Sequence, residues 1–142
     1  MPLIVGMAAA LELALADQQA RAQRLGALRD QLWQGLQALG GVQRNGAAAP
    51  RLPHNLNVCI SGVEGSALQR RLRDTLAVSS GSACSAGEPS HVLQALGLSR
   101  PQAAASLRFG LGRHTTSAEI AAAIAAVTAA VRDLRRGVPS GA

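Results

Sequence analysis

The chain has 142 residues, 48% of them apolar and 1% aromatic, and all of its 14 basic residues are arginine, giving a net charge of +6. This length fits one domain with a core of Ala, Leu, Val and Ile, and two cysteines are too few for a secreted disulfide framework. Free thiols in a cytoplasmic protein are the expectation, with a Cys59–Cys84 bond left open as the alternative. Scattered arginines with one Trp and one Phe make nucleic-acid binding unexpected, and Glu12 and Asp17 interrupt the apolar N-terminus too early for a membrane span or signal peptide.

The first third of the chain has a helical pattern. Leucines at three- and four-residue steps predict a long helix over residues 4–39, with a break left open, and Gly40-Gly41 ends it. Residues 42–45 predict a short strand, and the prolines of 46–53 predict a loop. This first helix should expose an apolar surface when nothing covers it, so self-association of the isolated chain is expected.

Two strands and a helix are predicted next. Residues 56–61, LNVCIS, alternate between apolar and polar side chains, which predicts a half-buried strand with Leu56, Val58 and Ile60 on one face. Cys59 faces the other way and is interpreted as a packing residue. A helix over 62–76 follows, with leucines at helical spacing, and then a short strand over 77–80 that leads into a cysteine loop at 79–89.

The C-terminal third contains helix-start signals and one more strand. Glu88 and Pro89 open a short helix that ends at Gly97, and Ser99 and Pro101 open another. Residues 106–112, SLRFGLG, predict a strand carrying Arg108. Thr116 and Glu119 have the spacing of a capping box before a last helix, whose apolar stripe is Ile120, Ile124, Val127, Val131 and Leu134. The basic clusters at 70–74 and 132–137 are interpreted as solvated helix faces.

This order of elements predicts an α+β fold. The expected architecture is a two-layer domain, with a small, mainly antiparallel sheet, helices on one face and a long helix in front. The boundaries that follow are a connecting helix over 1–40, the α+β domain over 41–136 with its cysteine loop, and a tail over 137–142.

Cys84 and Arg108 are the candidate functional residues. Cys84 lies among glycines and serines, where a thiol can be exposed and reactive, although a small, partly buried thiol in a turn fits the same residues. Arg108 can lie flat over the sheet, or it can present its planar guanidinium to a carboxylate. Together they are the parts of a site that handles an amino acid.

Other kinds of site are not predicted. His54, His91 and His114 show no metal-ligand spacing with the cysteines, so no metal site is expected. The chain also contains no glycine-rich phosphate-binding motif.

The segments SSGSACSAGEPSHVLQALGLS and ASLRFGLGRHTT together resemble the C-terminal part of NifS/IscS-type cysteine desulfurases. LNVCISGVEGSAL is similar to the strand and helix that precede the cysteine loop in that family, and PLIVGMAAALELAL is similar to the helix that joins the large domain to the small one. The resemblance runs from Pro2 to about Leu134.

The resemblance implies a fold and an activity. Family members are homodimeric enzymes of fold-type I that use pyridoxal phosphate (PLP) to convert L-cysteine to L-alanine, leaving a persulfide on an enzyme cysteine. The sulfur then passes to an acceptor protein for iron–sulfur cluster assembly or thiolation. Cys84 matches the persulfide-bearing cysteine, and Arg108 matches the arginine that binds the substrate carboxylate.

The chain also departs from the family pattern. It has no lysine for the Schiff base with PLP, it has no match to the family's catalytic histidine, and its loop from Cys84 to Glu88 is a couple of residues shorter than in the longer-loop members. The expectation is therefore a C-terminal part that binds no cofactor and is inactive by itself, acting with a PLP-binding large domain or a separate half. The alternatives are a stand-alone persulfide carrier or interaction module and an inactive truncated remnant.

Overall fold

The computed structural model describes residues 1–79, 81 and 88–137. Its elements run in the order α1 (Pro2–Ala16), α2 (Gln18–Gln37), β1 (Val42–Arg44), β2 (Asn55–Ile60), α3 (Gly65–Leu72), α4 (His91–Ala95), α5 (Arg100–Ala104), β3 (Ser106–Gly110) and α6 (Ser117–Gly137). The three strands form one antiparallel sheet in the order β1-β2-β3. The predicted α+β fold with a small antiparallel sheet is confirmed.

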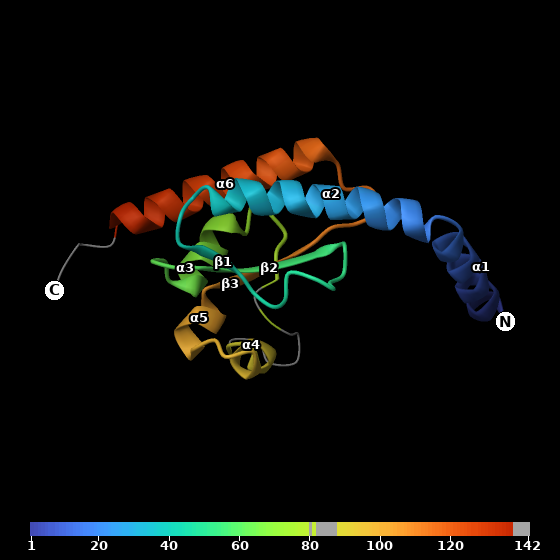
Figure 1. The fold of residues 1–142 in the computed structure, drawn as a ribbon, viewed down its shortest axis with the longest axis horizontal. Helices are drawn as coiled ribbons and strands as arrows, with labels where there is room; N and C mark the ends of the chain where they lie inside the picture. Colours follow the sequence, from blue (N-terminus) through green and yellow to red (C-terminus); the bar gives the residue numbers. More distant parts are fainter. Residues whose placement is uncertain (80, 82–87, 138–142) are drawn as a thin grey trace.

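The sheet lies between two groups of helices (Figure 1). The long helices α2 and α6 lie side by side over one face, and α3 packs against α6. The short helices α4 and α5 lie on the other side, with α5 packed against β2. The packed face is built by strand alternation, because Leu56, Val58 and Ile60 point under the long helices and are fully buried.

The predicted helix over 4–39 is two helices. They meet at Asp17 with a bend of 68°. Arg21 links the two sides of the bend, since its guanidinium donates to Asp17 Oδ1 over 2.6 Å and to the carbonyl of Ala14 over 3.0 Å. A helix end leaves such carbonyls without an intrahelical partner, so Arg21 stabilises the break.

Helix α1 contributes nothing to the core. Ala14 is half-buried, and every other residue of α1 is exposed. Helix α2, in contrast, buries Leu25, Leu32 and Leu36. Figure 1 shows α1 projecting away from the other elements. No helix in the described part of the chain is long and apolar enough by itself to span a membrane; α1 and α2 pass that test only as a bent pair.

The last helix has the predicted start and the predicted stripe. Thr116 and Glu119 form a reciprocal capping box, with Thr116 N donating to Glu119 Oε2 over 2.8 Å and Glu119 N donating to Thr116 Oγ1 over 3.3 Å. Ile120, Val127 and Val131 are buried in the core, and the other two stripe residues pack against it. The apolar periodicity of this segment is therefore confirmed.

The strand predicted over 77–80 is wrong, and the arginines of 132–137 are not only a solvated helix face. In the described part of 77–80, only Ser79 bridges Arg108, so this segment extends the sheet by a single residue pair. Arg135 in the 132–137 cluster donates to the carbonyls of Leu39, Gly40 and Ser61. A cation at these carbonyls satisfies acceptors that the end of α2 leaves free.

Candidate functional site

The open face of the sheet carries polar side chains where the packed face carries apolar ones. Asn57 on β2 and Arg108 on β3 are directly opposite each other in the antiparallel register, and Asn45 lies just beyond β1, where its backbone N–H donates to the carbonyl of Asn57. Side chains of one strand alternate between faces, so these groups share the side of the sheet away from α2 and α6. The predicted position of Arg108 on a strand is confirmed.

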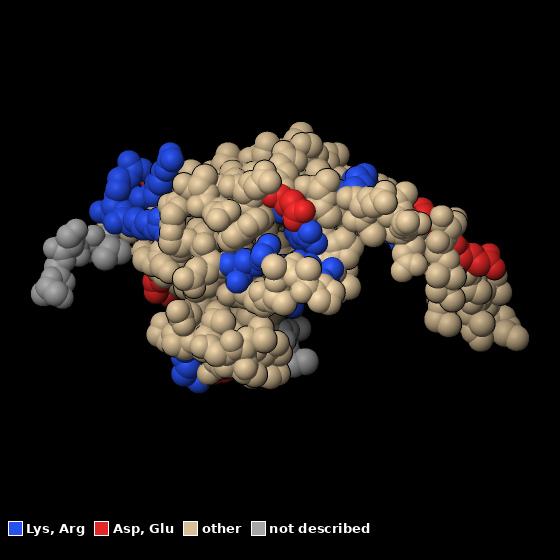
Figure 2. Space-filling model, viewed as in Figure 1, with Lys and Arg blue, Asp and Glu red and all other residues tan. Residues whose placement is uncertain are grey.

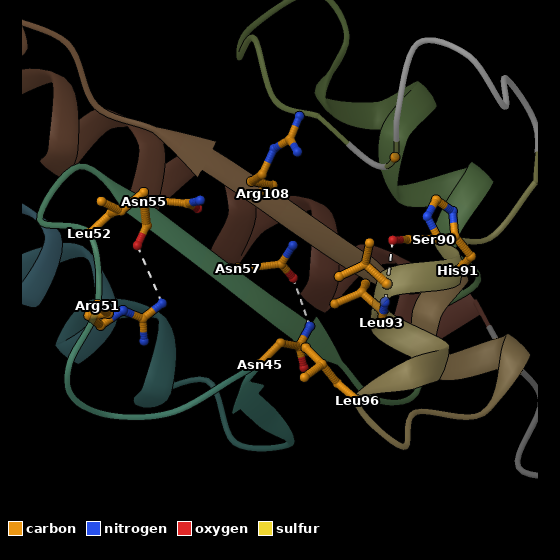
Figure 3. A pocket seen from close by; sticks show the side chains of 12 residues that line it. Asn45, Arg51, Leu52, Asn55, Asn57, Ser90, His91, Leu93, Leu96 and Arg108 are labelled. Atoms are coloured by element: carbon orange, nitrogen blue, oxygen red, sulfur yellow. Dashed lines mark hydrogen bonds between the residues drawn. The ribbon is translucent and has the colours of Figure 1, made fainter.

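A buried amide network supports this face. Asn45 is 8% exposed, and its Nδ2 donates to Asn57 Oδ1 over 2.7 Å and to Ser106 Oγ over 3.0 Å. Ser106 Oγ in turn donates to the carbonyl of Gln102 over 2.8 Å. With its oxygen occupied by Asn45, the Asn57 amide turns its Nδ2 toward β3 and Arg108 (Figure 3). The network thus fixes the orientation of a hydrogen-bond donor beside Arg108.

Arg108 is exposed and has no acidic partner among the described residues. Its Nη2 donates to Ser79 Oγ over 3.0 Å, and its backbone pairs with that of Ser79. One hydrogen bond leaves most of the five guanidinium N–H groups available. A carboxylate can therefore bind Arg108 without displacing an internal ion pair.

A cavity of about 390 Å³ lies between the open face and α4. Its charged and titratable lining groups are Arg51, His91 and Arg108, and most of the remaining polar lining comes from Asn45, Asn55, Asn57 and Ser90. Figure 3 shows Arg108 and the asparagines on the strands, with His91 and Leu93 facing them from α4. The combination of amide donors with two guanidiniums favours a small anionic ligand.

The predicted catalytic residue Cys84 lies outside the described residues. The described residues on either side of it, Gly81 and Ser90, both line the cavity. Ser90 Oγ caps α4 by accepting from Leu93 N, and Ser79 holds Gly81 through a hydrogen bond to its carbonyl. Gly81 and Ser90, which precede and follow Cys84 in the sequence, are thus part of the cavity that contains Arg108.

Cys59 is a buried packing residue, as predicted. It is a free cysteine with 4% exposure, so it forms no disulfide. Burial raises the pKa of the Cys59 thiol, and its hydrogen bond with Ser106 opposes this shift to a smaller extent. A buried thiol with a raised pKa is a poor nucleophile.

Some cavity residues were not predicted from the sequence. Arg51, in the loop before β2, lines the cavity, and so does His91, which the sequence places only at the start of a helix. Asn45 and Asn57 were read only as strand residues. The one available signal is the alternation of apolar and polar residues in 56–61, in which Asn57 occupies a polar position. No group of three or more metal-ligating side chains occurs in residues 1–79, 81 and 88–137.

Known proteins resemble this chain over nearly all of its length. It is 45% identical over 138 residues to the cysteine desulfurase IscS of Shewanella baltica, covering 96% of this chain and 34% of that relative. It is 48% identical over 141 residues to the cysteine desulfurase IscS of an Anaeromyxobacter species, covering 97% of this chain and 35% of that relative. No family model matches the chain.

Solved structures give the same result for the fold. A NifS-like protein has a TM-score of 0.80 and 29% identity, covering 92% of this chain and 33% of that protein. The NifS-like protein of Rickettsia africae, at 23% identity, shares the fold with a TM-score of 0.74 over 84% of this chain and 31% of that protein. The chain spans about a third of the length of the relatives it matches.

Proposed function

We infer that this chain is a C-terminal part of a NifS/IscS-type cysteine desulfurase, since it resembles such proteins over nearly its whole length and about a third of theirs, and from this premise we propose what its residues do. Arg108 binds the carboxylate of the L-cysteine substrate, and Cys84 receives the substrate's sulfur. The observation that carries the proposal is the exposed guanidinium of Arg108, which has no acidic partner among the described residues and lines a cavity that Gly81 and Ser90 also line.

The carboxylate site has two donors. Arg108 supplies charge and a planar pair of N–H groups that match a carboxylate. Asn57 Nδ2, oriented by Asn45, adds a neutral donor on the neighbouring strand. A carboxylate held from one side by both groups has a defined orientation, which an amino-acid substrate needs before its sulfur can be attacked.

The sulfur transfer is balanced within the substrate and one thiol. The Cys84 thiolate attacks the substrate sulfur, so a sulfur–sulfur bond forms and the carbon–sulfur bond breaks. The electron pair of that bond stays on carbon, which takes up a proton, and the products are L-alanine and a persulfide on Cys84.

The cofactor of the family does not fit the residues of this chain. PLP is held through a Schiff base with lysine, and the 142 residues contain none. We therefore assign PLP to a large domain or separate polypeptide that acts with this chain, and derive no step through it. A homodimer, a sulfur-acceptor protein and a cytoplasmic location belong to the same proposal, on the strength of the resemblance.

The test combines this chain with a PLP-binding N-terminal part of a cysteine desulfurase and measures L-alanine and sulfide formed from L-cysteine. Arg108→Gln should raise KM about 10- to 100-fold, because a hydrogen-bonded charge pair contributes about 1.5–3 kcal/mol. Arg113→Gln is the matched control, since Arg113 is also an exposed arginine near β3 but does not line this cavity. Equal effects of the two substitutions would contradict the role of Arg108.

Mass spectrometry tests the thiol separately. After turnover, a mass increase of one sulfur should be found on Cys84, should persist in Cys59→Ser and should be absent in Cys84→Ser. Persulfide on Cys84 without any alanine, when sulfur is supplied by a different active desulfurase, would instead favour the stand-alone carrier.

A further inference from the structure

Three arginines gather at the outer edge of the sheet around a single carboxylate. Arg29 lies on α2, Arg44 ends β1, and Arg51 lies in the loop between β1 and β2; the carboxylate is that of Asp30. We call these four residues, together with Trp33, the basic cluster. Figure 2 shows arginines beside one acidic side chain below the middle of α2.

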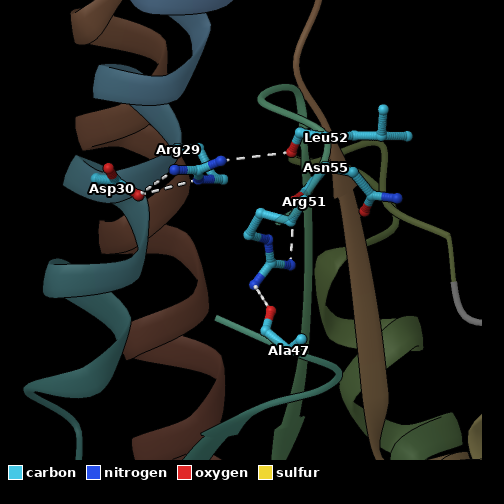
Figure 4. Close-up of polar contacts among 6 residues, drawn as sticks. All are labelled: Arg29, Asp30, Ala47, Arg51, Leu52 and Asn55. Carbon is cyan, nitrogen blue, oxygen red and sulfur yellow. Dashed lines mark hydrogen bonds and ion pairs between the residues drawn. The ribbon is translucent and has the colours of Figure 1, made fainter. Parts of the chain in front are cut away.

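Hydrogen bonds fix two of the arginines. Arg29 pairs with Asp30 over 2.8 Å, and its Nη1 donates to the carbonyl of Leu52 over 3.4 Å (Figure 4). Arg51 donates to the carbonyls of Ala47 and Asn55 over 3.4 and 3.3 Å. These bonds to backbone oxygens hold the guanidiniums in place but do not neutralise their charge.

Arg44 packs on an aromatic ring. Its guanidinium carbon lies 5.4 Å from the centroid of the Trp33 ring, which is cation–π geometry. Among the described residues Arg44 has no carboxylate partner. Trp33 is the chain's only tryptophan, so its emission reports directly on this surface.

The positive charge of the cluster is only partly compensated, because three guanidiniums share the one carboxylate of Asp30. Burial lowers the pKa of Arg51, and the charges of Arg44 and Arg29 lower it further, whereas Asp30 opposes them. Arg51 Nε is also buried without a hydrogen-bond partner. The guanidiniums of Arg44 and Arg29 thus repel that of Arg51, and a second negative group would relieve this repulsion.

Several arginines elsewhere in the described chain have partners. Arg70, Arg73, Arg100 and Arg136 each lie within 4.0 Å of a carboxylate, and Arg24 and Arg135 donate to several carbonyls. An edge strand is often blunted by one charged side chain, but that role does not require three guanidiniums around one acid. The basic cluster therefore carries more positive charge than its one carboxylate neutralises, and it can bind an external anion.

We propose that the basic cluster is a docking surface for an acidic segment of a partner protein. Its guanidiniums come from three elements, which matches carboxylates spread along a peptide. Nucleic acid fits less well, because Arg44 already covers Trp33 and the only other aromatic ring, Phe109, is buried. Arg51 also lines the cavity that holds Arg108, so a partner docked here lies beside the proposed sulfur-transfer site.

The test titrates the 142-residue chain with a hexaglutamate peptide at low salt and follows Trp33 fluorescence. We expect a saturable change that weakens as salt is added, because exposed ion pairs are screened. Arg44→Gln should weaken binding up to about fivefold, and Asp30→Asn, which removes the competing carboxylate, should strengthen it by a similar factor. Arg71→Gln, at an exposed arginine on α3, is the control and should leave the affinity unchanged.

Three results would overturn the proposal. These are no change of Trp33 emission with hexaglutamate, equal weakening by Arg71→Gln and Arg44→Gln, and tighter binding of a single-stranded RNA oligomer than of the peptide. Circular dichroism of each variant shows whether it is folded, and Asp30→Asn predicts a gain of affinity that unfolding cannot produce. None of these readouts depends on desulfurase activity.

Discussion

The two faces of the three-stranded sheet are built by alternate residues of the same strands, and one face is apolar whereas the other is polar. On the packed face, Leu56, Val58 and Ile60 are fully buried under α2 and α6. On the open face, Asn57, which alternates with these residues on β2, and Arg108, opposite Asn57 on β3, line a cavity. Because neighbouring residues of one strand point to opposite sides, the same short segments carry both the core and the candidate site. Substitutions on the two faces should therefore affect stability and ligand binding separately.

The largest effect is expected on the packed face. Leu56→Ala should lower the free energy of unfolding by about 3 kcal/mol, because a fully buried leucine leaves a cavity when it is truncated. Urea denaturation followed by circular dichroism measures this loss. Arg108→Gln, at an exposed position on the neighbouring strand, should change stability by no more than about 0.5 kcal/mol. Similar losses in both variants would show that the two faces are not energetically separate.

An intermediate effect is expected at Asn45, which is a buried residue on the open face. Asn45→Ala removes the donor shared by Asn57 and Ser106 and should cost about 1–2 kcal/mol, because it leaves a buried acceptor unpaired. The same change frees the Asn57 amide to rotate, so KM for L-cysteine should rise in the assembled enzyme. Gln43→Ala, at an exposed position on β1 just before Asn45, should change neither quantity. A KM effect without a stability effect would mean that Asn45 contacts the ligand directly.

The sequence predicts those elements whose evidence is local. The capping box of Thr116 and Glu119 and the apolar stripe behind it depend on spacings of three and four residues, and both are present in α6. The sequence does not locate the helix break at Asp17, because no proline or glycine lies next to it. Arg21, four residues further on, stabilises the bend through a contact with Ala14 that spacing alone does not reveal.

The candidate site was only half predictable for the same reason. Arg108 could be singled out as an arginine within an apolar strand, but Asn45 acts through partners 12 and 61 residues away. The strand predicted at 77–80 failed because the chain there meets β3 at one residue pair only. Burial of Asn45 and enclosure of the cavity by α4 are products of tertiary packing, which no local pattern contains.

The smallest effect concerns Cys59, which shares the side of Asn57 on β2 but is buried there. Burial raises the pKa of this thiol in the folded state, so the stability it contributes is complete below the unfolded pKa and is lost as pH rises through the folded pKa. The chain has no lysine and no tyrosine, so above pH 8 few other groups titrate. The free energy of unfolding should decline slightly from about pH 9 upward.

The Cys59→Ala variant isolates this decline. It keeps Cys84 and the N-terminal amine, so any pH dependence that they cause is common to both proteins. Urea denaturation between pH 7 and pH 10 should show a shallower decline in the variant than in the parent chain. Parallel curves would mean that Cys59 is as accessible to water as an unfolded thiol, and the open face would then be solvated along its whole length rather than closed over Cys59 and Ser106.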